Sequence, residues 1–353
     1  MNPLILPVFL PHLGCRERCL FCNQKATAPE APSPSSVREF IATSLREFPS
    51  GKNRREKQIA FYGGSFTAIT GEDQIRYLSE VQSFLSSGLI DSIRISTRPD
   101  ALDEGALSLL KEYGVKTVEI GAQTMIDEVL SLSYRGHWAE DTVSAVRRLQ
   151  QWGFEVGLHL MIGLPGDSPD YFFETLDRVI EMKPDFVRIH PTLVLRGAPL
   201  ERLWQAGEYS PLSLEETVQW LKKGILRLEG APIPVARIGL QPTKGLENHI
   251  LAGPYHPALH QLVDSRIFFD MASTLLEIYR MEPESVFYCH PAEISNMRGQ
   301  RNGNLAKLRA RFGLKGISVE GRDNVRKNTL ILQTESGEVS IQRIDILNSG
   351  GSA

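Results

Sequence analysis

The sequence predicts an α/β protein, a partial (β/α)6 barrel of the TIM-like kind followed by a small α+β C-terminal domain. Short apolar runs alternate with longer amphipathic runs from Leu4 to His190, which is typical of repeated β-α units. Strands connected by helices are expected to lie parallel, because each helix supplies the long crossover connection that a parallel pair needs. Polar or glycine-rich strings follow successive strands, where chemistry gathers in barrels of this kind.

The predicted elements of the barrel follow in a regular order. Its strands are expected at 4–10, 59–62, 92–96, 117–120, 155–162 and 186–190. Its helices are expected at 36–48, with Ser35 or Ser36 as the cap, and at 71–86, 104–113, 139–152 and 169–182. A further helix at 214–228 and a short strand at 235–239 precede a stretch rich in glycine and proline at 240–257. We therefore assign the barrel to residues 1–243.

The remaining residues, 244–353, are predicted to form the small C-terminal domain, an appendage for substrate or RNA. Helices are expected at 259–279 and 304–311, and strands at 316–319, 328–333 and 339–343. This part is unusually basic: from Arg298 to Lys327 there are nine Lys or Arg and two acids. A second basic run contains Lys52, Arg54, Arg55 and Lys57. Both runs are either solvated faces or a footprint for an RNA backbone.

Composition excludes some functions. The net charge is −3, so there is no whole-surface attraction to nucleic acid. No stretch of about 20 apolar residues could cross a membrane. The first residues lack the basic start and cleavage site of a signal peptide. We expect a cytoplasmic protein with no membrane contact.

Three of the four cysteines, Cys15, Cys19 and Cys22, fall within eight residues. A disulfide framework would spread its cysteines, so the cluster of thiols indicates a metal site. Structural zinc takes four ligands, and nearby His12 has poor spacing for a closed site, although spacing alone leaves a zinc loop possible. Three thiolates suit a 4Fe-4S cluster with one open iron. Cys289 is then either a buried thiol or a second-site residue beside His290.

The spacing C-x3-C-x2-C, with Phe21 before the last cysteine, is typical of radical S-adenosylmethionine (SAM) enzymes. In such enzymes the open iron is the place where SAM binds. The amino and carboxylate groups of SAM can chelate that iron, and an electron from the cluster cleaves the sulfonium bond. The polar strings after the next strands are Gly63-Gly64, 97–100, 121–123 and 163–166. Each alone would be an ordinary turn, but together with the cysteines they predict a cofactor site.

The sequence resembles the radical SAM branch that contains the catalytic subunit of the Elongator tRNA-modifying complex. The resemblance is carried, in order from Cys15 to about Gln241, by FYGGSFT, STRPD, the run from Glu119 to Gln123, LSYRGH, GLHLMIGLPGD and PDFVRIHPTLVLRGAPLERLW. A weaker resemblance is to oxygen-independent coproporphyrinogen oxidases. The Elongator-like resemblance implies a 4Fe-4S cluster and SAM as cofactors.

The resemblance also implies roles for individual residues. The methionine end of SAM would be lined by Gly63, Gly64 and Ser65, and methionine or ribose hydroxyls would be faced by Ser96, Thr97 and Gln123. Arg135 would meet the carboxylate, and adenine would lie beside Phe21, Met161, Ile162 and Gly163. Substrate contacts would come from His159, Arg188, His190 and Arg196. The alternatives are core histidines at His159 and His190 and a barrel-end salt bridge at Arg188.

Two departures from the Elongator subunit bear on function. That subunit carries an acetyltransferase domain after the barrel and spaces its first cysteines more widely, whereas roughly 100 residues follow the barrel here. They resemble the short C-terminal domain of bacterial Elongator-like proteins. We expect reductive SAM cleavage and hydrogen abstraction from a substrate, with tRNA modification as the first choice. The alternatives are a tetrapyrrole or other small-molecule oxidoreductase and a non-catalytic haem-handling protein. The expected electron donor is a flavodoxin or ferredoxin.

Overall fold

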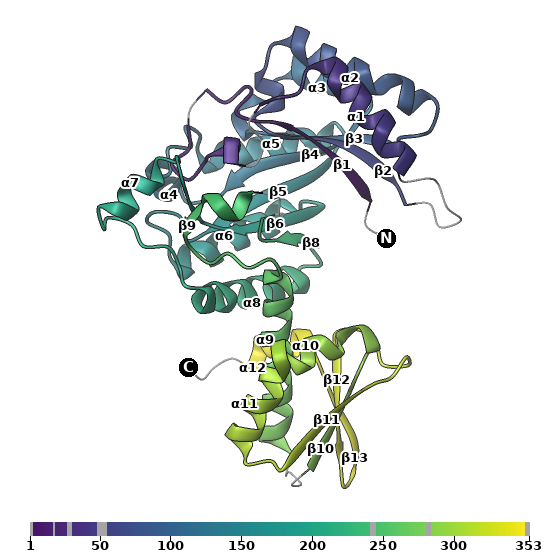
Figure 1. The fold of residues 1–353 in the computed structure, drawn as a ribbon, viewed down its shortest axis with the longest axis vertical. Coiled ribbons are helices and arrows are strands. Elements are labelled where there is room, and N and C mark those ends of the chain that lie inside the picture. Colours follow the sequence, from purple (N-terminus) through teal and green to yellow (C-terminus); the bar gives the residue numbers. More distant parts are fainter. Residues whose placement is uncertain are drawn as a thin grey trace. The chain divides into compact units, whose positions relative to one another are not determined.

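A computed structural model describes residues 3–16, 18–26, 30–47, 55–240, 245–279 and 284–349 (Figure 1). It divides the chain into two compact units, the first comprising 1–212 with 240–254 and the second 213–239 with 255–353. The predicted boundary between residues 243 and 244 lies outside the described residues. The division differs from that single boundary, because the segment 213–239 belongs to the second unit and the chain then returns to the first.

The first unit contains the predicted parallel sheet. The first unit contributes six strands to this sheet, hydrogen-bonded in the order β1-β2-β3-β4-β5-β6 and each parallel to the next. They are β1 (Leu4–Leu10), β2 (Lys57–Gly63), β3 (Ser92–Thr97), β4 (Val115–Gln123), β5 (Glu155–Ile162) and β6 (Phe186–Pro191). A small antiparallel pair, β7 (Val194–Leu195) with β9 (Ile250–Ala252), was not predicted. The predicted fold class, a partial β/α barrel, is confirmed.

Helices connect the strands as the sequence predicts, and two short ones are additional. The helices are α1 (Pro34–Glu47), α2 (Gly71–Ser86), α3 (Glu104–Glu112), α4 (Asp127–Leu132), α5 (Ala139–Gln151), α6 (Pro169–Met182) and α7 (Leu200–Gln205). Side-chain oxygens of Thr70, Asp103 and Ser168 accept the first free N–H groups of α2, α3 and α6. The cap predicted for the first helix was wrong by two or three residues, since α1 begins earlier and Ser33 Oγ accepts from the Ser36 N–H at 3.2 Å.

The barrel sheet has an apolar and a polar face. Ile95, Val118 and Leu158 are fully buried on the apolar face, and α3 and α5 pack against the strands. Successive side chains of a strand point to opposite faces, so residues such as Glu119 lie on the other face. We call this second face, which carries the polar network described below, the concave face.

The second unit is an α+β arrangement. Its elements are α8 (Leu214–Gly230), β8 (Val235–Ile238), α9 (Leu259–Ile278), β10 (Glu284–Cys289), α10 (Ile294–Arg298), α11 (Gly303–Phe312), β11 (Gly316–Gly321), β12 (Thr329–Thr334), β13 (Gly337–Gln342) and α12 (Ile346–Ser349). Four of its strands form a sheet in the order β11-β10-β12-β13. The sequence did not predict β10, whose last residue Cys289 is fully buried. In the described ranges, every helix is too short or too polar to span a membrane.

Candidate functional site

The cysteine loop follows β1 and packs against the end of β2. Gly14 has φ +75°, and a Cβ there would lie 2.2 Å from the Ser65 carbonyl oxygen. A Cβ on Gly64 would lie 1.9 Å from the Leu13 carbonyl oxygen. The same backbones are hydrogen-bonded, since the Ser65 N–H donates to Leu13 O at 2.8 Å. Only glycine fits this close approach, which fixes the cysteine loop beside the carboxyl end of β2.

One guanidinium, that of Arg135, contacts Cys19 and acts electrostatically on the other two thiols. Cys19 is buried, and Cys15 and Cys22 are half-buried. Burial raises the pKa of Cys15 and raises that of Cys22 to about 12, and the neighbouring Cys19 adds to both shifts. Arg135 acts in the opposite direction on both pKa values. Its Nη1 lies 3.0 Å from Cys19 Sγ, and its Nη2 donates to the Gly121 carbonyl.

The three thiols and the neighbouring cation are a donor set that fits an iron–sulfur cluster. Within the described ranges, no three His, Cys, Asp or Glu side chains converge as ligands of one metal ion. Cysteines that hold a 4Fe-4S cluster each bind a different iron, so three thiols leave the fourth iron open. The buried Nε of Arg135 has no hydrogen-bond partner in the described part of the chain. Arg135 thus supplies positive charge to the thiolates, and the carboxylate contact predicted for it stays a prediction.

Hydroxyl groups join the ends of β2 and β3. Ser65 Oγ lies 2.9 Å from Thr97 Oγ1 and accepts from the Arg98 N–H, and Thr97 Oγ1 lies 2.6 Å from Thr67 Oγ1. Ser65 and Thr97 are both buried. Their hydroxyls therefore hold the two loops together, and the cofactor contacts expected of Ser65 and Thr97 stay predictions. Ser96 is half-buried and pairs in register with β4.

The carboxyl end of β5 is held from both sides. Asp167 Oδ2 accepts from the Gly163 N–H at 2.8 Å, and the Tyr209 hydroxyl donates to the Gly163 carbonyl at 2.6 Å. Burial raises the pKa of Asp167 to about 6, against the effect of its backbone N–H partners. Met161 is half-buried, but Ile162 is fully buried, so only the Ile162 backbone could approach adenine. Sequence reasoning missed both Asp167 and Tyr209.

The other predicted cofactor residues surround these strand ends. Phe21 and Met161 pack against the same buried apolar group, Ile126, Val129 and Leu164. Gly63 has φ +105°, and its carbonyl accepts from the Gln24 amide. Gln123 ends β4 with φ +69°. A Cβ on Gly121 would lie 3.0 Å from Gln123 Nε2 and 3.3 Å from Arg135 Nη2, so these two side chains share one corner of the site.

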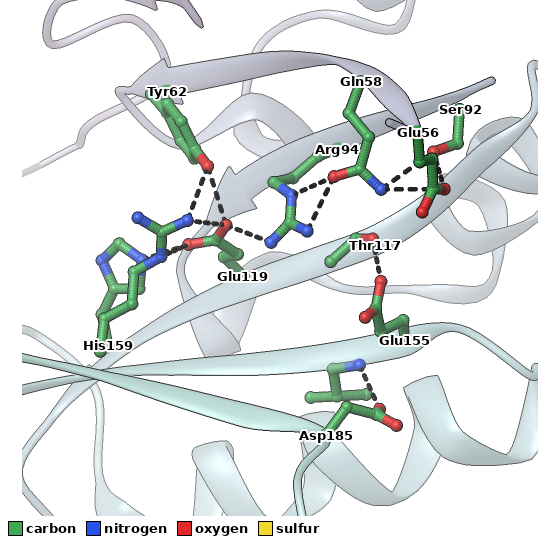
Figure 2. Close-up of polar contacts among 12 residues, drawn as sticks. Glu56, Gln58, Tyr62, Ser92, Arg94, Thr117, Glu119, Glu155, His159 and Asp185 are labelled. Atoms are coloured by element: carbon green, nitrogen blue, oxygen red, sulfur yellow. Dashed lines mark hydrogen bonds and ion pairs between the residues drawn. The ribbon is translucent and has the colours of Figure 1, made fainter. Parts of the chain in front are cut away.

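A charged network centred on Glu119 lies on the concave face (Figure 2). The Glu119 side chain is fully buried. Its Oε1 accepts hydrogen bonds from Arg94 Nη1 at 2.6 Å and from the Tyr62 hydroxyl at 2.9 Å. Arg188 Nε lies 2.9 Å from Oε2, which also bonds His159 Nε2. Five strands, β2 to β6, therefore each contribute a side chain to this polar network. The His190 ring lies at its edge, 5.6 Å from the ring of His159.

The network places one carboxylate and two guanidiniums on the concave face. Burial acts to raise the pKa of the Glu119 carboxyl, but His159, Arg188 and Arg94 hold it well below its usual range. Two guanidiniums thus meet one carboxylate. Arg188 is a partner of Glu119, so the salt-bridge alternative is confirmed for it, and His159 is a hydrogen-bonded histidine that keeps 21% side-chain exposure. Sequence reasoning missed Glu119, Arg94 and Tyr62 as network members, although a charged residue inside an apolar strand was a usable signal.

Arg196, the fourth predicted substrate residue, is not part of this network. Its side chain is exposed, and its backbone carbonyl accepts from Asn23 Nδ2 at 2.7 Å. This bond ties the cysteine loop to the segment after β7. A cavity of about 510 Å³ lies there, lined by His12, Arg18, Cys22, Asn23, Lys25 and residues Gly197, Ala198, Pro199, Glu201 and Arg202. One of the three thiols therefore opens toward a surface rich in cations.

A parallel partial barrel with clustered thiols and glycine turns at the carboxyl ends of its strands is a barrel enzyme whose chemistry is concentrated at that edge. Comparison with protein families defines the class. Residues 9–179 match the family model of the Radical SAM superfamily, and residues 184–268 match that of the Radical_SAM C-terminal domain. The chain belongs to the radical SAM superfamily, and it is an enzyme of the kind that uses a 4Fe-4S cluster and SAM.

Individual relatives place it beside the Elongator-like members. It is 38% identical over 128 residues to the tRNA uridine(34) acetyltransferase of Methanocaldococcus jannaschii, which is 35% of this chain and 24% of that protein. It is 31% identical over 205 residues to Protein YhcC of Escherichia coli, 57% of this chain and 64% of that one. It therefore spans less than two thirds of either relative.

A solved structure shares the fold. The archaeal Elp3 of Methanocaldococcus infernus, with an N-terminal deletion, superposes with a TM-score of 0.58 at 22% identity. The superposition covers 77% of this chain and 63% of that chain. At this identity the match concerns the fold, which agrees with the partial barrel predicted from the sequence.

Proposed function

We propose that Cys15, Cys19 and Cys22 hold a 4Fe-4S cluster and that SAM binds across the carboxyl ends of β2 to β5. These residues would hold the two groups, and the chemistry supplied when both are bound would be reductive cleavage of SAM to a 5′-deoxyadenosyl radical for hydrogen abstraction from the substrate. The observation that carries this proposal is a loop of three thiols that packs onto the Gly63-Gly64 turn and contacts the Arg135 guanidinium through Cys19.

The chain's own residues would bind and orient these groups. Arg135 stabilises negative charge on the thiolates, since a buried cation favours the ionised form. Gly64 lets the backbone of the cysteine loop lie directly on β2. Asp167 and Tyr209 hold the Gly163 backbone in place, so the adenine segment is fixed before a ligand binds. Phe21 and Met161 supply the apolar wall beside it.

An external donor would deliver the electron at the cavity beside Cys22. Arg18, Lys25 and Arg202 line that cavity together with one acid, Glu201. An acidic carrier such as a flavodoxin or ferredoxin would be steered to these cations, and its association rate would fall as ionic strength rises. This electrostatic complementarity supports a carrier of that class as the partner.

For the substrate we propose tRNA. Relatives that carry the printed name tRNA uridine(34) acetyltransferase support this choice. The concave face supports it as well, because Arg94 and Arg188 outnumber the single carboxylate of Glu119, and polar donors such as Tyr62 lie beside them. A wall of this kind suits a polar, negatively charged substrate better than an apolar macrocycle.

The cofactor proposal is tested by anaerobic reconstitution with iron and sulfide. Wild-type protein should acquire cluster absorbance and, after reduction, form 5′-deoxyadenosine from SAM. Cys19→Ala should lose both. Cys289→Ala is the matched control, because Cys289 is a buried thiol of the second unit and should leave iron content unchanged. A Cys19→Ala protein that still forms 5′-deoxyadenosine would overturn the assignment.

The substrate proposal needs a separate assay. Unmodified tRNA should raise the rate of 5′-deoxyadenosine formation above the substrate-free rate, and a new nucleoside should appear by mass spectrometry of digested tRNA. A DNA oligonucleotide of equal length controls for polyanion effects. An enzyme that cleaves SAM at the same rate with and without tRNA, and modifies none, contradicts tRNA as the substrate but leaves the cofactor assignment intact.

A further inference from the structure

The basic stretch of the second unit divides into paired and unpaired cations. Arg311 lies 2.7 Å from Glu277, and Arg322 lies 2.6 Å from Glu338 with its guanidinium over the Tyr288 ring. These residues fit the interpretation as solvated faces. Arg298 donates only to the Val319 carbonyl, at 3.4 Å, and Arg301 forms no ion pair or hydrogen bond within the described ranges. In the other basic run, Lys57 is buried at the start of β2, and Lys52 and Arg54 lie outside the described residues.

The two unpaired arginines share a pocket of about 490 Å³, which is lined by α10, by the turn that follows it and by one residue of α9. Its lining contains no acidic side chain. It consists of Gln261, Pro291, Ile294, Ser295, Arg298, Gly299, Gln300, Arg301 and Asn302. The polar members, apart from the cations, are hydroxyl and amide groups. A concave surface of this composition attracts an anion and provides hydrogen-bond donors for its oxygens.

The loop that shapes the pocket is held in a strained conformation. Arg301 and Asn302 have φ values of 51° and 61°, which non-glycine residues rarely adopt. Asn304 fixes this turn, because its Nδ2 lies 2.8 Å from Ser265 O and 3.2 Å from Met297 O. A Cβ on Gly299 would lie 2.9 Å from the Asn304 side chain, so the clamp requires glycine. Such a conformation persists where the surrounding contacts over-determine it, as at ligand sites.

The first turn of α11 adds to the positive potential of the pocket. This ten-residue helix begins at Gly303, and the side chain of its N-cap residue, Asn302, makes no capping hydrogen bond. Uncapped N–H groups and the helix dipole favour a negative charge near that end. His256 lies at the rim, 3.5 Å from Gln300. Lys307 and Arg309, farther along the same helix, form no ion pair within the part of the chain that the structure describes, so the basic surface extends beyond the pocket.

We infer that this pocket binds a backbone phosphate of RNA, with Arg298 and Arg301 as its cationic ligands. Guanidinium forks match phosphate oxygens, and the amide and hydroxyl groups of Gln300 and Ser295 can complete the contact. Both arginines, Gln300 and Ser295 are exposed, which suits a phosphate presented on a chain, whereas small-molecule sites enclose most of their ligand. The choice of RNA rests on the proposed function, but the phosphate site rests on the pocket alone.

Binding of a fluorescent unmodified tRNA transcript to the full chain tests the inference. Anisotropy would be measured at several salt concentrations for wild type and for Arg298→Gln with Arg301→Gln. Each phosphate contact contributes about 0.7–0.9 to the slope of log K against log salt. We expect the double variant to lower that slope by about 1–2 and to weaken binding about tenfold or more at low salt. Lys315→Gln is the matched control, because Lys315 follows the opposite end of α11.

The outcomes separate this site from the proposed function. Arg298→Lys with Arg301→Lys should recover most of the slope, since charge is retained. A double glutamine variant with the wild-type slope would overturn the phosphate site, while SAM cleavage and tRNA turnover could stand. No tRNA binding by wild type at low salt would overturn the choice of RNA, and retained 5′-deoxyadenosine formation would show the cofactor site intact. Displacement of bound tRNA by millimolar pyrophosphate in wild type only would support the inference.

Discussion

Neutralising Glu119 is the sharpest test of the network on the concave face. Glu119→Gln keeps the size and shape of the side chain but removes its charge. The guanidiniums of Arg94 and Arg188 would then face an amide, whose NH2 group cannot accept their hydrogen bonds. Arg94 would keep two bonds to Gln58 Oε1, at 3.0 and 2.8 Å, whereas Arg188 would keep only the Tyr62 hydroxyl at 3.1 Å.

The expected loss of stability follows from burial. The Glu119 side chain has 0% exposure, and Arg94 and Arg188 have 5% and 14%. Breaking a buried ion pair by removing one partner costs about 3–5 kcal/mol, because the remaining charge is left uncompensated. For a unit of this size each kcal/mol shifts the midpoint of thermal unfolding by about 2–4 °C, so we expect a fall of roughly 6–20 °C.

Differential scanning calorimetry is the suitable assay, since the two units can unfold separately and the transition of the second unit should not move. Glu155→Gln is the matched control: Glu155 starts the adjacent strand, and its partner is the neutral Thr117 hydroxyl (Figure 2). Glu155→Gln should cost less than about 1 kcal/mol of unfolding free energy, because the glutamine carbonyl oxygen can still accept from the Thr117 hydroxyl. Equal shifts of the unfolding midpoint for the two variants, or a loss of unfolding free energy below about 1 kcal/mol for Glu119→Gln, would refute the argument that Glu119 balances two buried cations.

Three further predictions follow from the same geometry. The low pKa of Glu119 gives stability that is present above about pH 4.3 and lost on acidification, so urea midpoints of wild type and Glu119→Gln should converge from pH 6 to pH 3. Gly64→Ala should abolish cluster absorbance after reconstitution, because its Cβ would meet backbone at 1.9 Å, whereas Gly71→Ala, with nothing within 4 Å, should retain it. Tyr209→Phe should weaken SAM binding about fivefold by anaerobic calorimetry, since Gly163 loses its 2.6 Å hydrogen bond, about 1 kcal/mol.

The barrel and the cysteine loop could be predicted from the sequence because their signals are local. An apolar run such as 155–162 reads as a strand without knowledge of its neighbours, and the structure has that strand with the same ends. The spacing of Cys15, Cys19 and Cys22 is likewise visible along the chain. Parallel topology then brings the strand ends to one edge, so the positions of Gly63 and Gly163 near the site follow from topology.

The Glu119 network and the support of Gly163 could not be predicted because their partners are distant in sequence. Arg188 lies 69 residues from Glu119, and Tyr209 lies 46 residues from Gly163. Which hydroxyl faces the ligand also depends on packing, since Ser65 and Thr97 bond each other whereas Ser96 does not join them. In the second unit, β10 was missed because its pairing with β11 and β12 is long-range.

The net charge of the chain does not describe the charge of its local surfaces. The chain as a whole carries −3, yet unpaired cations gather beside Cys22 and in the pocket of Arg298 and Arg301. Charges farther apart than about 10 Å are largely screened at 0.1 M salt, so a bound anion responds to the local cations rather than to distant acids. If an acidic electron carrier and an RNA backbone bind at these two places as proposed, each association should weaken separately when its own cations are neutralised.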